Sequence, residues 1–161
     1  GLDISETMVG FARAAVEDDP RFEFHVVSGY DLAAVPSGAV DFAYSVDVFI
    51  HIFDVDVAAS YLREMFRVLK PGGTLRFNVR GFRVATAYSG SLGGRFAKLL
   101  HRLGIRSLAR HRWSPEQPAE FNGNQYTEKE IRALVEKAGL RVLSVEATVD
   151  HEHIWCAAQR P

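Results

Sequence analysis

The sequence predicts an α/β fold with a mostly parallel sheet that ends in an antiparallel hairpin. Residues 40–80 read as a strand, a helix and a second strand, and such a crossover places its two strands parallel. Residues 1–28 repeat this order of strand, helix and strand. Residues 140–148 and 153–158 read as strands separated only by a short polar turn, which leaves no room for a crossover helix and predicts a hairpin.

The N-terminal elements are predicted from a cap and an apolar stripe. Gly1–Ile4 reads as the end of a strand, and Ser5 is a good N-cap for a helix ending near Asp19–Pro20. The inner side of this helix carries Val9, Phe11, Ala12, Ala15 and Val16. A strand at Phe22–Ser28 follows, and Gly29–Leu32 forms the loop at its carboxyl end.

The central unit has the clearest pattern. Val40–Val46 is a short apolar run rich in β-branched and aromatic residues, which is typical of a buried strand. An apolar helical stripe follows at three- and four-residue spacing: Ala58, Tyr61, Leu62, Met65, Phe66 and Leu69. Lys70–Gly73 is expected to stop the helix, because Pro71 cannot continue its hydrogen bonds. Thr74–Val79 is then the second strand.

Residues 82–126 differ in character and are interpreted as an inserted lid over the carboxyl edge of the sheet. No acidic residue occurs between Met65 and Pro115, whereas bases cluster in the lid. They are Arg95, Lys98, Arg102, Arg106, Arg110 and Arg112. Two interpretations stay open: a solvated basic helix face, or a positively charged lid that selects an anionic substrate.

The last third returns to regular structure. Thr127 and Glu130 form a capping box at the start of a helix, and Gly139 is its C′ residue. Its inner side carries Ile131, Leu134, Val135 and Ala138, and the hairpin follows.

Composition sets the outer limits. The chain has 161 residues, 47% of them hydrophobic and 24% charged, with a formal net charge of -1, which fits one globular domain. Near-neutral charge gives no case for nucleic acid or a membrane surface, and no apolar run is long enough to span a bilayer. The single cysteine, Cys156, fits a reducing, cytoplasmic compartment. The chain begins without methionine, and we expect an upstream portion to be missing.

Five segments, in order, resemble the class I S-adenosylmethionine-dependent methyltransferases, which have a Rossmann-like fold. They are Gly1–Met8, Ser28–Leu32, Asp41–His51, Leu69–Leu75 and Tyr126–Leu140. The resemblance runs from the family's second strand to its seventh and implies S-adenosylmethionine as the cofactor. The sequence lacks the family's first strand and the glycine-rich loop after it. We therefore expect a partial, N-terminally truncated methyltransferase domain over residues 1–161, which alone binds the cofactor weakly or not at all.

The cofactor contacts are expected at the carboxyl ends of the strands. Asp3 is placed to accept hydrogen bonds from both ribose hydroxyls, and the alternative is a helix N-terminal acid favoured by the dipole. Ile4 and Met8 would pack on adenine or ribose, or serve as core residues. Asp31 would accept the adenine amino hydrogen, with Leu32 beside the ring; the alternative for Asp31 is a turn former.

The next strand end is expected to meet the reacting centre. Ser45 and Val46 end that strand where its backbone would approach the cofactor, or they simply terminate it. His51 is the candidate general base for a hydroxyl or amine, since histidine has a pKa of about 6.5, and the alternative is a histidine packed under the lid. Asp47 is a weaker candidate. His151 and His153 have no evident third ligand, so no metal is expected.

Three functions remain from the sequence. The first is transfer of a methyl group from S-adenosylmethionine to the oxygen or nitrogen of a small-molecule acceptor. The second is a nicotinamide-dependent Rossmann oxidoreductase, because Asp3 would equally suit a dinucleotide ribose. The terminal hairpin and the lack of a Tyr-x-x-x-Lys pair argue against it. The third is a non-catalytic interaction module that keeps the methyltransferase fold.

Overall fold

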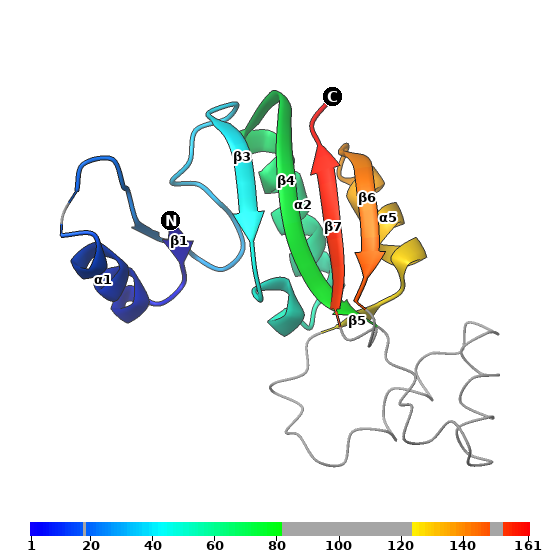
Figure 1. The fold of residues 1–161 in the computed structure, drawn as a ribbon, viewed down its shortest axis with the longest axis horizontal. Coiled ribbons are helices and arrows are strands. Elements are labelled where there is room, and N and C mark those ends of the chain that lie inside the picture. The colour runs from blue at the N-terminus through cyan, green and yellow to red at the C-terminus, as the bar shows by residue number, and fades with distance from the viewer. Residues whose placement is uncertain (18, 82–123, 149–152) are drawn as a thin grey trace, which may run out of the picture.

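The computed structural model describes residues 1–17, 19–81, 124–148 and 153–161, and every structural statement below concerns these residues. Within them the strands form two separate sheets. A two-stranded sheet lies at the N-terminal end, and a five-stranded sheet contains the rest (Figure 1).

The N-terminal unit consists of β1 (Leu2–Asp3), α1 (Glu6–Ala15) and β2 (His25–Val26). The two strands are parallel, with Leu2 opposite His25. Both outer bounds differ from the sequence prediction, because α1 ends before Asp19–Pro20 and β2 is shorter than Phe22–Ser28. The helix stops where Glu17 takes a left-handed φ of 51°, and β2 pairs only as far as the two-residue β1 allows.

The central crossover is confirmed. β3 (Val40–Ser45) and β4 (Leu69–Gly81) are parallel, and α2 (Val55–Val68) connects them. Helix α2 ends before Lys70–Gly73, as expected, but β4 begins directly after it at Leu69 and is therefore longer than the predicted strand at Thr74–Val79. Hydrogen bonds explain this, since the N–H of Gly72 donates to Arg160 O and the N–H of Arg160 donates to Gly73 O, each at 2.9 Å.

The C-terminal elements are β5 (Gln125–Tyr126), α5 (Glu128–Lys137), β6 (Arg141–Ala147) and β7 (His153–Gln159). The predicted hairpin is confirmed, since β7 runs antiparallel to both β6 and β4. The capping box at Thr127 is present. Of the expected lid over residues 82–126, the structure describes only 124–126, and Gln125–Tyr126 pairs parallel with β4; residues 82–123 lie outside the described part.

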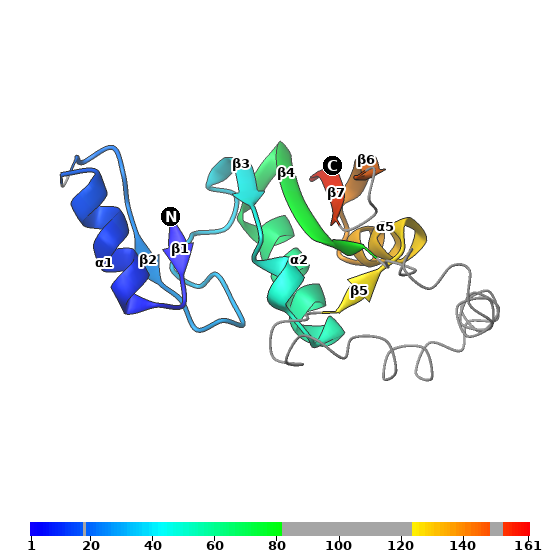
Figure 2. The same ribbon diagram turned by 60° about the horizontal axis from the view of Figure 1, so that its bottom comes forward.

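The larger sheet has the order β3-β4-β7-β6, with β5 paired to β4. Helices α2 and α5 lie together on one face of this sheet (Figures 1 and 2). The main core lies between them and the sheet: Phe49, Ala58, Leu62, Leu69, Leu75, Phe77, Val79, Tyr126, Ile131, Val135, Leu140, Ile154, Cys156 and Ala158. The α/β fold class is thereby confirmed.

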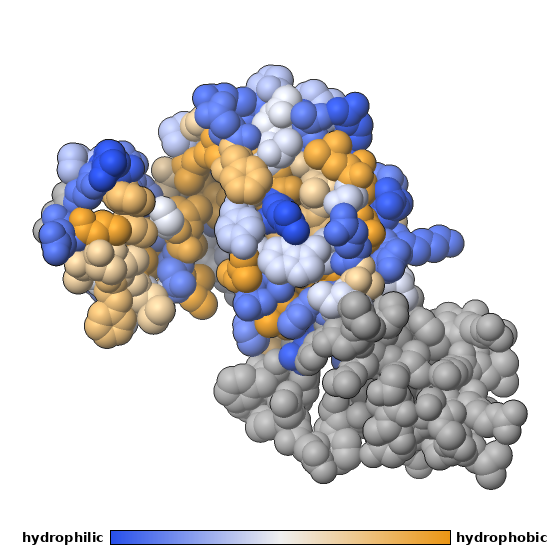
Figure 3. Space-filling view, viewed as in Figure 1, coloured by the Kyte–Doolittle hydropathy of each residue, from blue (hydrophilic) through white to orange (hydrophobic). Residues whose placement is uncertain are grey.

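No described helix covers the other face of the larger sheet, where blue and orange side chains mix (Figure 3). The rings of Phe42 and Tyr44 stack there with centroids 6.2 Å apart, and both side chains are exposed. The guanidinium of Arg76, opposite Tyr44, lies 5.2 Å from the ring centre of Trp155. The sheet therefore presents a mixed aromatic and cationic surface to solvent on this side.

Candidate functional site

The first part of the candidate site is the junction of β1 and α1. Ser5 caps α1, and the N–H of Ser5 donates to Asp3 Oδ1 at 2.8 Å. This bond turns the chain from strand to helix and leaves Asp3 Oδ2 without a donor among the described residues. Asp3 is exposed, as are Ile4 and Met8, at 68% and 54%. The junction therefore presents a carboxylate and two apolar side chains to solvent.

The loop after β2 lies beside this junction. Gly29 has φ of +86°, a left-handed conformation that side chains disfavour, and a Cβ built there would lie 3.4 Å from Cγ2 of Ile4. The close approach places the loop against the residue that follows Asp3. Tyr30, next in the chain, is 66% exposed. The structure thus brings the tips of β1 and β2 together.

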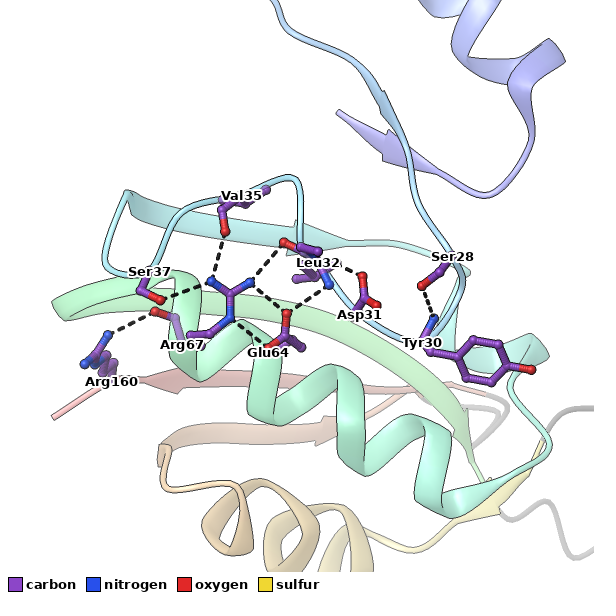
Figure 4. Close-up of polar contacts among 10 residues, drawn as sticks. Ser28, Tyr30, Asp31, Leu32, Val35, Ser37, Glu64, Arg67 and Arg160 are labelled. Carbon is purple, nitrogen blue, oxygen red and sulfur yellow. Dashed lines mark hydrogen bonds and ion pairs between the residues drawn. The ribbon is translucent and has the colours of Figure 1, made fainter.

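The second part of the site is the loop of residues 31–37, which α2 holds through side chains. The N–H of Leu32 donates to Glu64 Oε2 at 2.9 Å, and its carbonyl accepts from Arg67 Nη2 at 3.0 Å (Figure 4). The Leu32 side chain is buried, at 4% exposed. Asp31 is half-buried, and its Oδ1 accepts the N–H of Ala33 at 3.1 Å. Leu32 therefore anchors the loop, and Asp31 is its half-buried carboxylate.

Hydrogen bonding and burial around this loop shift three pKa values, with smaller effects of charge. The hydrogen bond from Arg67 is the largest cause that lowers the pKa of the Glu64 carboxyl, and the same bond raises the pKa of Arg67. Burial, followed by the negative charge of Asp31, raises the pKa of Tyr61. At neutral pH the Glu64–Arg67 pair is therefore fully ionised and Tyr61 keeps its proton.

The third part of the site is the end of β3. Ser45 is 8% exposed, and Val46 is 37% exposed. Asp47 follows with a left-handed φ of 57°. Its N–H donates to Oδ1 of Asn78 at 2.7 Å, and Nδ2 of Asn78 donates back to Oδ1 of Asp47 at 2.6 Å. Asn78 was not among the predicted site residues, and alternation along β4 does not predict its burial, because Asn78 is 1% exposed between the buried Phe77 and Val79.

His51 lies in the short 3-10 helix η1 (Phe49–His51), just beyond this strand end. Its side chain is exposed and has no hydrogen bond or ion pair with the described residues. The helix is anchored by Phe49, whose ring lies 4.8 Å from that of Phe77. The carbonyl of Ile52 accepts the N–H of Asn124 at 2.9 Å. An anchored helix thus presents an unconstrained imidazole.

The predicted site residues fall into two groups, one on each sheet. Pairing of β1 with β2 brings Asp3, Ile4 and the loop after β2 together, whereas pairing of β3 with β4 fixes Ser45, Val46 and His51. The two sheets share no strand pairing, and the segment of residues 28–39 connects them. The strand arrows of β1, β3 and β4 nevertheless point toward the same end of the molecule (Figure 1).

Away from the carboxyl ends of β1 and β3, the described part of the chain has a hollow, but it has no cluster of metal-ligating side chains and no helix that could span a membrane. A shallow hollow of about 300 Å³ lies at the opposite end of α1 from Asp3 and is lined by Arg13, Val16, Asp19, Pro20 and residues 22–25. Within the described residues no group of three His, Cys, Asp or Glu side chains could hold a metal ion. None of the described helices has the length and apolar character needed to cross a membrane.

Comparisons with known proteins bear on the family and the fold. Residues 1–77 match a family model described as a methyltransferase domain, and no curated protein matches the sequence. A possible exported protein from Bordetella parapertussis is 19% identical with a TM-score of 0.71; the match covers 100% of this chain but 52% of that one.

Two further structures cover more of their own length. A methyltransferase described as S-adenosylmethionine-dependent, from Methanosarcina mazei, is 23% identical with a TM-score of 0.66, and the match covers 99% of this chain and 80% of that one. A putative methyltransferase from Haloferax volcanii, in complex with the Trm112 methyltransferase activator, is 22% identical with a TM-score of 0.66, covering 100% and 71%. These likenesses show the fold.

Proposed function

Because residues 1–77 match the methyltransferase-domain family and the chain has the fold of a class I S-adenosylmethionine-dependent methyltransferase, we propose that it transfers a methyl group to a small-molecule acceptor. The feature that supports this most is the exposed Asp3 carboxylate at the carboxyl end of β1, beside the loop after β2. That position suits recognition of a ribose in nucleotide-binding α/β folds.

The residues present fit the nucleoside part of S-adenosylmethionine. Asp3 has an oxygen without a donor among the described residues, and it would accept the two ribose hydroxyls. Ile4 and Met8 are exposed beside it and would pack on the ribose and adenine. Asp31 would accept the amino hydrogen of adenine. Leu32 is buried, so we assign it to the anchoring of the loop beside the ring rather than to a broad contact with it.

When bound, the cofactor would supply a sulfonium methyl group that is open to attack by a nucleophile. The acceptor's lone pair would form the new bond to that carbon, and the electron pair of the broken carbon–sulfur bond would stay on sulfur. The chain's contribution is to align the acceptor and exclude water. Ser45 and Val46 would border the reacting centre through their backbone, at the fixed end of β3.

His51 would take the proton that a hydroxyl or amine acceptor loses. Its imidazole is exposed on an anchored short helix and has no hydrogen bond or ion pair with the described residues, which supports this role. A neutral imidazole is an effective base near neutral pH. Asp47 is not our candidate base, because Asn78 engages its Oδ1.

The acceptor is proposed from sequence alone. The basic residues within 95–112 favour an anionic small molecule, and they lie outside the described residues. The strand pairing leaves the two halves of the site on separate sheets. We therefore expect the 161 residues alone to bind the cofactor in the high-micromolar range or more weakly.

Binding of S-adenosylhomocysteine to the chain tests the proposal, and two-dimensional NMR measures it because the method detects weak binding. Asp3→Asn should weaken this binding roughly tenfold, because a hydrogen bond to a charged group contributes about that much to an equilibrium constant. Asp41→Asn is the matched control, since Asp41 is also an exposed carboxylate on a strand but lies near the start of β3, paired with Lys70. Shifts induced by NAD but not by S-adenosylhomocysteine would favour the oxidoreductase instead.

A further inference from the structure

We propose that Glu64 and Arg67 of α2 are positioning residues for the adenine side of the cofactor site, an inference that rests on the proposed function. Neither side chain touches the ligand. They hold the loop of residues 31–37 in the one conformation that presents Asp31 to the adenine amino group. The affinity for adenine over a base without that amino group would then depend on an ion pair outside the site.

The ion pair supplies the loop with hydrogen bonds beyond its own turn bond, in which the N–H of Val35 donates to Leu32 O at 2.9 Å. Between residues 31 and 37 the chain has no helix or strand, so its backbone groups need other partners. Glu64 accepts the N–H of Leu32 and Arg67 donates to its carbonyl, so both polar groups of one residue end on one pair of side chains (Figure 4). Further along, Arg67 Nη1 donates to Val35 O at 3.0 Å and Ser37 Oγ at 3.1 Å.

All the N–H donors of the Arg67 guanidinium are used in these hydrogen bonds. A guanidinium has five N–H donors in a planar fork, and five hydrogen bonds leave this one. Two reach Glu64, from Nε at 2.8 Å and from Nη2 at 2.7 Å, and three reach the loop. Lysine has three donors on a single atom and cannot reproduce the arrangement. The chain end supports it from behind, because Arg160 Nη1 donates to the carbonyl of Arg67 at 3.2 Å.

The ion pair acts directly on Asp31 through a shared peptide. The N–H that Glu64 accepts belongs to the peptide group between Asp31 and Leu32, so fixing that plane restricts the backbone of Asp31. The carboxylate then accepts the N–H of Ala33, which fixes its direction relative to the loop. The hydrogen bond to Glu64 is the main cause that raises the pKa of Arg67, and the negative charge of Asp31 adds a smaller part.

Attachment of the loop to the helix does not require these charges. The buried Leu32 side chain already anchors the loop, whereas the Glu64 and Arg67 side chains are 20% and 32% exposed. Apolar burial is not directional, whereas the hydrogen bonds of a planar guanidinium group are directional. What the pair adds is orientation of the loop backbone, and with it the direction of the Asp31 carboxylate.

The test compares two ligands that differ at the adenine amino group, S-adenosylhomocysteine and its deaminated form S-inosylhomocysteine. Their dissociation constants are measured by NMR titration for the chain and for Glu64→Ala, Glu64→Gln and Arg67→Lys. The control is Asp19→Ala, which breaks the Asp19–Arg21 pair, also forked but remote from the loop. If the oriented loop falls to about a tenth of the population, the preference for adenine falls about tenfold.

The ratio of the two constants decides the outcome. We expect the wild-type chain and Asp19→Ala to prefer S-adenosylhomocysteine, Glu64→Ala and Arg67→Lys to lose that preference, and Glu64→Gln to keep part of it through its amide oxygen. Parallel weakening of both ligands, with an unchanged ratio, would show a purely structural pair and overturn the inference. If Glu64→Ala does not fold, the ratios of Glu64→Gln and Arg67→Lys decide. Absence of any shift at the proposed site, even with millimolar S-adenosylhomocysteine, would instead reject the cofactor site proposed above.

Discussion

Two polar side chains inside the larger sheet are stabilised in opposite ways. Asn78 of β4 is buried with a partner, because it exchanges two hydrogen bonds with Asp47 and so offsets its desolvation. In return the pair holds Asp47 in a left-handed conformation that costs about 1–2 kcal/mol. Cys156 of β7 is buried among apolar residues, and it avoids the cost of a charge by keeping its proton.

Cys156 should make the chain less stable as the pH rises above 9. Burial raises the pKa of its thiol from 9.0 to about 12. Between these values the unfolded chain releases the proton and the folded chain retains it, so the free energy of unfolding falls by up to about 1.4 kcal/mol per pH unit. Below pH 9 both states hold the proton and the effect vanishes.

Urea unfolding of the wild type and Cys156→Ala at several pH values between 8 and 11 measures this. Other groups titrate in the same window, but their contributions are common to both proteins. The difference in unfolding free energy should therefore be constant up to about pH 9 and then shrink, because only the wild type carries the thiol. A difference that stays constant to pH 11 would mean that the thiol is open to solvent.

Single residues could be predicted from the sequence where local pattern fixes their place. Asp3 and Ser45 end short strands, and the structure has them there. Glu64, Arg67 and Asn78 could not be singled out, because their partners lie about 30 residues away along the chain and only the fold brings them together. Whether the predicted site residues bind the cofactor stays a prediction.

At the scale of elements, local signals determined the helices better than the strands. The start of α5 was predictable from Thr127 and Glu130, because the capping box is a contact between neighbours in the sequence. The end of β2 was not, because a strand extends only as far as its partner does, and that partner is elsewhere in the chain. For the same reason β4 begins before Thr74, since the backbone of Arg160 forms hydrogen bonds with Gly72 and Gly73.

Removal of the N-cap of α5 should cost stability without changing the fold. Thr127 Oγ1 accepts the N–H of Glu130, and the Glu130 carboxylate accepts the N–H of Thr127 at 2.8 Å. Thr127→Ala should therefore lower the free energy of unfolding by about 1 kcal/mol. Glu130→Gln should cost less, because glutamine also completes a capping box. Thr7→Ala, at an exposed position within α1, serves as the control and should change it by less than about 0.5 kcal/mol.

Chemical denaturation monitored by circular dichroism measures all three variants. The slope of unfolding free energy against denaturant should be the same for each, since the surface exposed on unfolding does not change. A Thr127→Ala variant as stable as Thr7→Ala would show that the capping box contributes nothing to α5 in the folded chain.

At the scale of the whole molecule, the two sheets differ in how much core they share. The main hydrophobic cluster draws all its members from residues 40–158 and none from the N-terminal unit. That unit instead exposes much of its apolar surface: Leu2, Ile4, Met8, Phe11, Phe22 and Val26. The link between the two runs through residues 28–39, whose hydrogen bonds reach α2. The sequence predicted the strands and their directions. Strand pairing depends on contacts that are distant in the sequence, so no local pattern encodes the lack of pairing between β1 and β3.

The N-terminal unit should therefore open more readily than the larger sheet, and a cofactor should close it. With few buried contacts, its amides are expected to exchange with solvent through local opening, whereas amides of β4 and β7 exchange only on global unfolding. Native-state hydrogen exchange, read by NMR, should show weak protection at residues 25–27 and strong protection at 75–79 and 154–158.

S-adenosylhomocysteine should raise protection at residues 25–27, since Asp3 on β1 would hold its ribose while the end of β3 borders its sulfur. Equal protection in both sheets without ligand would mean that they unfold as one unit, and the separation would then not explain weak binding. A ligand that raised protection only in the larger sheet would place the cofactor away from Asp3.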